Sequence, residues 1–116
     1  MDTDFSSSAI VINTDGMGHG DETLRHRLLT NYLRTLIELE RPPKFILLYA
    51  DGVKMAAATS PCRAELTQLR AAGAQIITCR TCLDHYGLME QLPSEEIGNM
   101  LMIVEAQAAA GKVIVL

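Results

Sequence analysis

The sequence contains no tryptophan, and aromatic residues make up only 4% of its 116 residues. Single-stranded nucleic acids stack on aromatic side chains, so a stacking surface for bases is not expected. Basic residues are also few, because ten Lys and Arg residues stand against fourteen Asp and Glu residues and leave a net charge of -4. A nucleic-acid-binding domain usually has a basic face, so the composition argues against that class.

Long apolar runs are missing as well, and none approaches the roughly 20 residues that a membrane span requires. Residues 1–8 are polar and acidic and lack the basic and apolar regions of a secretory signal, so we expect a cytoplasmic protein. The chain has only three cysteines. In a reducing compartment such cysteines seldom form a disulfide framework; catalysis, redox chemistry or metal binding is more usual.

The chain does have a 48% apolar share, which is typical of a globular protein. Short apolar runs alternate with amphipathic segments, a pattern that predicts strands alternating with helices. The predicted strands cover residues 9–13, 45–49, 74–78 and 112–116. The last helix is expected to begin at Ser94, a good N-cap, and to continue to Gly111.

This alternation predicts an α/β protein with a single domain over residues 9–116, preceded by a disordered segment over residues 1–8. We expect a mostly parallel sheet of four to five strands flanked by helices, with a strand order around 2-1-3. Ligands bind at the carboxyl ends of parallel strands. With the first strand central, the loops over residues 15–20, 51–54 and 79–82 are expected to converge there.

Cys79 and Cys82 are the candidate catalytic residues of that site. They lie three residues apart, between an apolar run and a segment that predicts a helix. Backbone N–H groups at a helix start favour negative charge and lower the pKa of a nearby cysteine. Two small buried apolar residues are the alternative interpretation of the same pair.

Cationic and imidazole side chains close to the pair are candidate supporting residues. Lys54 and Arg80 carry positive charges that could stabilise a thiolate or a persulfide anion. His85 follows Cys82 by three residues and could orient either sulfur, although an exposed helix histidine is an equal alternative.

The glycine-rich loop after the first strand completes the candidate site. Gly16 and Gly18 allow backbone amides to approach an anionic sulfur closely. Asp15 and Asp51 are interpreted as residues that fix their loops through Asx-type bonds to backbone N–H groups. The loop does not have the spacing of a dinucleotide-binding motif, because Asp21 stands at the third glycine position.

Three segments resemble the DsrE-like domain of YedF-type proteins, which are sulfurtransferase-like proteins linked to selenium metabolism. They cover residues 12–18, 52–54 and 79–87. The third, Cys-x-Thr-Cys-Leu-Asp-x-Tyr-Gly, is the most specific, and the likeness extends over nearly the whole chain from Ala9. The resemblance implies an α/β fold and a homo-oligomer.

Several members of the wider DsrE/TusD family carry sulfur as a persulfide on a cysteine just after the third strand, eight residues before a glycine. Here these residues are Cys79 and Gly87, so the resemblance favours Cys79 as the sulfur carrier and Cys82 as a helper or resolving thiol. A typical YedF-type chain begins with a TusA-like sulfur-carrier domain. About eight residues precede the first strand here, so the implied partner is a TusA-like persulfide carrier acting in trans.

Three functions therefore stay open: sulfur relay, a C-x-x-C dithiol/disulfide redox protein, and a non-catalytic oligomeric interaction protein. A thioredoxin-like protein places this motif earlier, after its first long strand, which favours sulfur relay. Whether the chain is a persulfide sulfurtransferase enzyme stays open. No cofactor is expected, and no metal ion either, because there is no second C-x-x-C pair for zinc.

Overall fold

Five parallel strands form the centre of the molecule in the computed structural model, which describes residues 4–116. The strands are β1 Ser8–Ile12, β2 Phe45–Leu48, β3 Gln75–Cys79, β4 Ile97–Gly98 and β5 Lys112–Val115. Each neighbouring pair runs parallel. The prediction of a mostly parallel sheet in a single α/β domain is confirmed.

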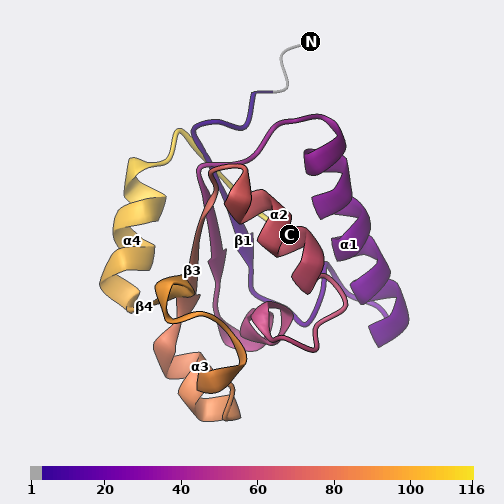
Figure 1. The fold of residues 1–116 in the computed structure, drawn as a ribbon, viewed down its shortest axis with the longest axis vertical. Coiled ribbons are helices and arrows are strands. Elements are labelled where there is room, and N and C mark those ends of the chain that lie inside the picture. The colour runs from indigo at the N-terminus through magenta and orange to yellow at the C-terminus, as the bar shows by residue number, and fades with distance from the viewer. Residues whose placement is uncertain (1–3) are drawn as a thin grey trace.

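Helices cover both faces of this sheet. They are α1 Glu22–Glu38, α2 Arg63–Ala71, α3 Arg80–Tyr86 and α4 Met100–Ala109, with 3₁₀ turns η1 Ala50–Ala56, η2 Met89–Gln91 and η3 Ser94–Glu96. Figure 1 shows α1 and α2 on one side, α4 on the other, and α3 beyond the carboxyl end of β3. Among residues 4–116, no helix combines the length and the apolar character needed to cross a membrane.

The core lies mainly between the sheet and the α1–α2 layer. Every residue of β1 and β2 is buried, which explains why these strands are continuous apolar runs without alternation. Leu29, Leu33 and Leu36 of α1 are buried as well, at the spacing of one helix face. On the other side of the sheet, α4 buries only Ile103 and Ala106.

The strand order is β4-β3-β2-β1-β5, so the expected order of 2-1-3 is wrong in the position of the third strand. β3 pairs with β2, and the other edge of β1 is taken by β5. The chain crosses the sheet in one direction from β1 to β4 and then returns through α4 to pair β5 with β1. Apolar strands look alike in sequence, so the pattern that predicts them does not specify which neighbour each one takes.

The segment expected as one helix from Ser94 to Gly111 is divided into η3, β4 and α4. The N-cap of the helix is Asn99, five residues later than Ser94, and its side chain accepts a hydrogen bond from the N–H of Met102 at 2.9 Å. Ser94 makes no side-chain cap. The difference arises because the residues between them pair with β3 as a short edge strand.

A buried carboxylate fixes that edge strand to α2. Glu96 is only 1% exposed, and both of its oxygens accept hydrogen bonds from Arg63, each at 2.8 Å. Arg70 donates a further hydrogen bond at 3.1 Å. Gly98 then lies against Ile77, where a Cβ would approach the isoleucine side chain to 2.6 Å. These contacts join η3 and β4 to α2 and β3, which lie earlier in the chain.

A disordered segment is expected over residues 1–8, and positions 1–3 of that segment lie outside the described residues. Beyond them, Phe5 packs against the core. Ser8 is fully buried and belongs to β1, pairing with Lys112 of β5. The carbonyl of Ser8 also accepts a hydrogen bond from the N–H of Lys44 at 2.9 Å. The first strand therefore begins one residue earlier than its apolar run.

Candidate functional site

The two candidate cysteines lie where β3 passes into α3. Cys79 is the last residue of β3 and the N-cap of α3, and its side chain is almost fully buried, with 2% of the residue exposed. Cys82 lies in the first turn of α3 and is partly exposed. Both are free cysteines. The helix starts at Arg80, so Cys82 belongs to a helix and not to the expected loop.

The two thiols interact with each other. The pKa of Cys82 is raised, first by partial burial and then by hydrogen bonding and charge repulsion with Cys79. A hydrogen bond from the N–H of Ala50 acts in the opposite direction and favours the thiolate. The site is thus a coupled pair of thiols in which only one member reaches the surface.

The hydrogen-bond donor to Cys82 comes from the start of η1. The N–H of Ala50 lies 3.2 Å from Sγ of Cys82. Ala50 has a φ of 51°, in the left-handed region that residues with a Cβ rarely adopt. A conformation of this kind costs on the order of 1 kcal/mol and persists where its surroundings enforce it. Its occurrence beside a free thiol marks this turn as a candidate functional element.

Contacts with the end of β1 hold the η1 turn in place. The N–H of Tyr49 donates to the carbonyl of Ile12 at 3.2 Å, and the N–H of Gly52 donates to the carbonyl of Tyr49 at 3.0 Å. A Cβ at position 52 would overlap the carbonyl oxygen of Ile12. Only glycine lets the turn lie this close to the strand, so Gly52 sets the position of Ala50 indirectly.

A second contact between η1 and α3 involves Tyr86 and Asp51. The hydroxyl of Tyr86 donates a hydrogen bond to the Asp51 carboxylate, which lowers the pKa of Asp51 and raises that of Tyr86. Nζ of Lys54 lies 3.4 Å from Oδ1 of Asp51 and 4.5 Å from the centre of the Tyr86 ring. Lys54 is therefore paired with a carboxylate.

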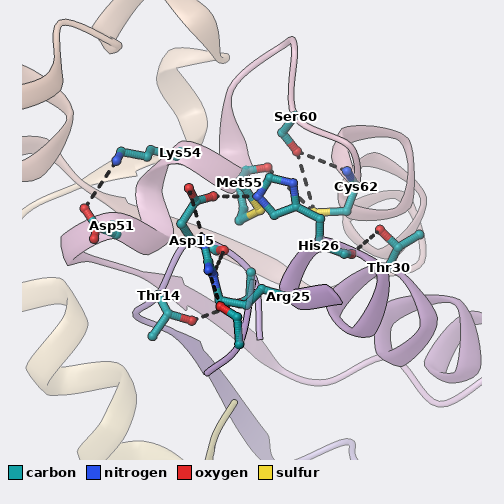
Figure 2. A network of polar contacts seen from close by, with 12 residues as sticks. Thr14, Asp15, Arg25, His26, Thr30, Asp51, Lys54, Met55, Ser60 and Cys62 are labelled. Carbon is teal, nitrogen blue, oxygen red and sulfur yellow. Dashed lines mark hydrogen bonds and ion pairs between the residues drawn. The ribbon is translucent and has the colours of Figure 1, made fainter. Parts of the chain in front are cut away.

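Side chains of α1 hold the glycine loop, as Figure 2 shows. Oδ1 of Asp15 lies 2.8 Å from Nε2 of His26, and Nε of Arg25 donates to the Asp15 carbonyl at 2.9 Å. The N–H of Gly16 donates to the carbonyl of Thr14 at 2.8 Å. Asp15 therefore fixes its loop through helix side chains, and the expected Asx-type bond is not the means.

The structure brings together only part of the predicted site. η1, with Asp51 and Lys54, joins the two cysteines, whereas no hydrogen bond within residues 4–116 links the glycine loop to either thiol. Arg80 is exposed, and His85 packs edge-to-face on Tyr86 at 4.9 Å between ring centres. The same part of the chain contains no group of three or more His, Cys, Asp or Glu side chains arranged to hold a metal ion.

Sequence reasoning missed two residues of this site. Tyr86 follows Cys82 by four residues, a spacing that places both on one face of a helix and could have identified it. Ala50 has no such signal, because its contribution is a backbone N–H whose direction depends on how η1 packs against β1.

Comparison with known proteins gives the fold. No family model matches the chain, and no curated protein matches it in sequence. Among solved structures, the ychN protein from E. coli matches with a TM-score of 0.67 and 21% identity, over 96% of this chain and 99% of the other.

Two further solved structures are described as proteins of unknown function. MTH1491 from Methanobacterium thermoautotrophicum matches with a TM-score of 0.69 and 20% identity, over 96% of this chain and 99% of the other. BT1422 from Bacteroides thetaiotaomicron matches with a TM-score of 0.66 and 16% identity, over 95% of each chain. The present chain therefore shares its fold with these three proteins.

Proposed function

We propose that this chain is a sulfur-relay protein that carries sulfane sulfur as a persulfide on Cys79, with Cys82 as its helper thiol. The observation that supports the proposal is the pair of free, interacting thiols at the junction of β3 and α3. This junction lies at the carboxyl end of a parallel strand, where such sheets place their sites. The resemblance to YedF-type proteins favours the same chemistry and a TusA-like carrier in trans as the sulfur donor.

The chemistry is thiolate attack on the outer sulfur of a donor persulfide. The donor's sulfur–sulfur bond breaks, a new one forms on the protein, and the donor leaves as a thiol, so there is no net oxidation. In a resolving role, Cys82 would attack the inner sulfur of the Cys79 persulfide and release hydrosulfide. The Cys79–Cys82 disulfide left behind would then require a dithiol reductant.

Mass spectrometry tests the relay. After incubation with a persulfide donor, we expect the intact protein to gain about 32 Da, the mass of one sulfur, and to lose it on treatment with cyanide. A double variant that lacks both thiols of the pair, Cys79→Ala with Cys82→Ala, should gain no removable sulfur, whereas Cys62→Ala, which removes a fully buried thiol, should behave as wild type. A wild-type protein that gains no removable sulfur would exclude the relay.

Dithiol/disulfide exchange is the second candidate, and the placement of two free thiols three residues apart at the start of α3 favours it. Equilibration in redox buffers tests it. A redox protein should form the Cys79–Cys82 disulfide at a defined potential and be reduced by thioredoxin. If one thiol reacts alone and no disulfide appears, this candidate is rejected.

We also propose that the chain forms a homo-oligomer through α4. Four apolar side chains of α4 are exposed, at 55% for Met100, 63% for Leu101, 38% for Met102 and 51% for Val104. α4 thus exposes more large apolar side chains than it buries, which supports a surface for a second copy of the chain. The same surface supports the non-catalytic interaction alternative.

A further inference from the structure

We infer that Cys82 is the thiol at which sulfur enters the site, and that Cys79 receives the sulfur from Cys82. This inference rests on the proposed sulfur relay and assigns the order of its two thiols. Sulfur entry requires a thiol that a donor can reach along the line of its sulfur–sulfur bond. Cys82 is partly exposed, whereas Cys79 is 2% exposed and belongs to the buried core.

The backbone of η1 favours the same residue. Ala50 directs its N–H at Sγ of Cys82, and this donor stabilises a thiolate or a persulfide anion on that sulfur. Within residues 4–116, no backbone N–H donates to Sγ of Cys79. Because Ala50 is held in a left-handed conformation, the donor is already oriented before a sulfur donor arrives.

Tyr86 and Asp51 act as positioning residues for the backbone N–H of Ala50. Tyr86 lies one helical turn after Cys82, and its hydroxyl binds the residue that directly follows Ala50. Lys54 lies over the Tyr86 ring and beside the Asp51 carboxylate, which adds a second link between the turn and the helix. These contacts hold η1 against α3 at Cys82, the accessible thiol of the pair.

The relay then has two balanced steps. First, the Cys82 thiolate attacks the outer sulfur of a donor persulfide, the donor's sulfur–sulfur bond breaks, and the donor leaves as a thiolate. Second, the Cys79 thiolate attacks the outer sulfur of the Cys82 persulfide, and Cys82 leaves as a thiolate that takes up the proton given up by Cys79. Both steps exchange one sulfur–sulfur bond for another, so neither needs an oxidant or a reductant.

The order of loading is measured with glutathione persulfide on the full chain carrying Cys62→Ala. Samples are stopped with iodoacetamide at short times, and the added sulfur is located by peptide mass spectrometry. We expect sulfur on Cys82 at the earliest times and on Cys79 later. We expect Cys82→Ser to load at least about tenfold more slowly, because the remaining thiol is buried. Cys79→Ala should load at the initial wild-type rate and hold its sulfur on Cys82.

Three outcomes contradict the assignment while leaving the relay intact: sulfur that appears first on Cys79, a Cys82→Ser variant that loads as fast as wild type, or a Cys79→Ala variant that fails to load. The first needs no variant at the pair, so it decides the order even if a substituted protein folds poorly. Absence of sulfur on both thiols of the unsubstituted pair overturns the proposed function instead.

Discussion

At the scale of single residues, two cysteines three positions apart have different surroundings. Cys79 closes a buried strand, whereas Cys82 lies in the first turn of a helix that begins beyond the sheet. The sequence predicted both thiols and the strand-to-helix junction. It could not predict which thiol is accessible, because that depends on the η1 turn that packs against α3 from another part of the chain.

The pH dependence of Cys82 reactivity follows from its raised pKa. Partial burial and Cys79 raise the pKa above the ordinary cysteine value of 9.0, so the reactive thiolate should reach half of its maximum only above that pH. The rate of Cys82 alkylation by iodoacetamide, followed by peptide mass spectrometry, should therefore still increase beyond pH 9.0. Cys79→Ala should move the profile to lower pH, because it removes two of the causes. A plateau well below pH 9.0 in wild type would contradict this prediction.

At the scale of elements, tertiary contacts decide where the last helix begins. Ser94 has the character of a helix cap, and the apolar residues after it continue the pattern, so the sequence predicted one helix. In the structure Glu96 is bound by Arg63 and Arg70, which lie 33 and 26 residues earlier in the chain. An ion pair over such a separation leaves no periodic signal, so the edge strand β4 could not be predicted.

Glu96→Gln should destabilise the protein because it leaves two arginines without the buried carboxylate that they bind. We expect the free energy of unfolding to decrease by about 3 kcal/mol, since removal of one partner of a buried ion pair leaves the other charge without its partner. Urea denaturation followed by circular dichroism measures the change. Glu95→Gln is the matched control, because it removes the same charge from an exposed neighbouring position and should cost below about 0.5 kcal/mol. Equal effects of the two substitutions would show that the buried ion pair contributes little.

At the scale of the whole molecule, helices cover the two faces of the sheet to different extents. α1 and α2 bury the long apolar strands on one side, whereas α4 alone covers the other side, as Figure 1 shows. Of the apolar residues at positions 100–104, only Ile103 is buried and the other four are exposed. A second copy of the chain is the occupant that we propose for this surface.

Leu101→Glu should weaken that assembly, because it places a charge in the middle of the proposed interface. We expect association to weaken at least about tenfold, and the measured mass to shift toward that of the monomer in light scattering coupled to size exclusion. Leu24→Glu is the control, because Leu24 is also an exposed leucine, 45% accessible, but lies on α1. A wild-type protein that is monomeric at all concentrations tested would contradict the proposed assembly.

The sequence by itself determined the four longer strands, most of the helices and the two candidate thiols, because each depends on local patterns of apolar residues, caps and spacing. The α/β class and the parallel sheet followed from their alternation. Only the tertiary structure decided the order of the strands, the division of the last helix and the accessibility of each thiol. Those features depend on contacts between distant segments, such as Ala50 with Cys82 and Glu96 with Arg63, and such contacts exist only once the chain has packed.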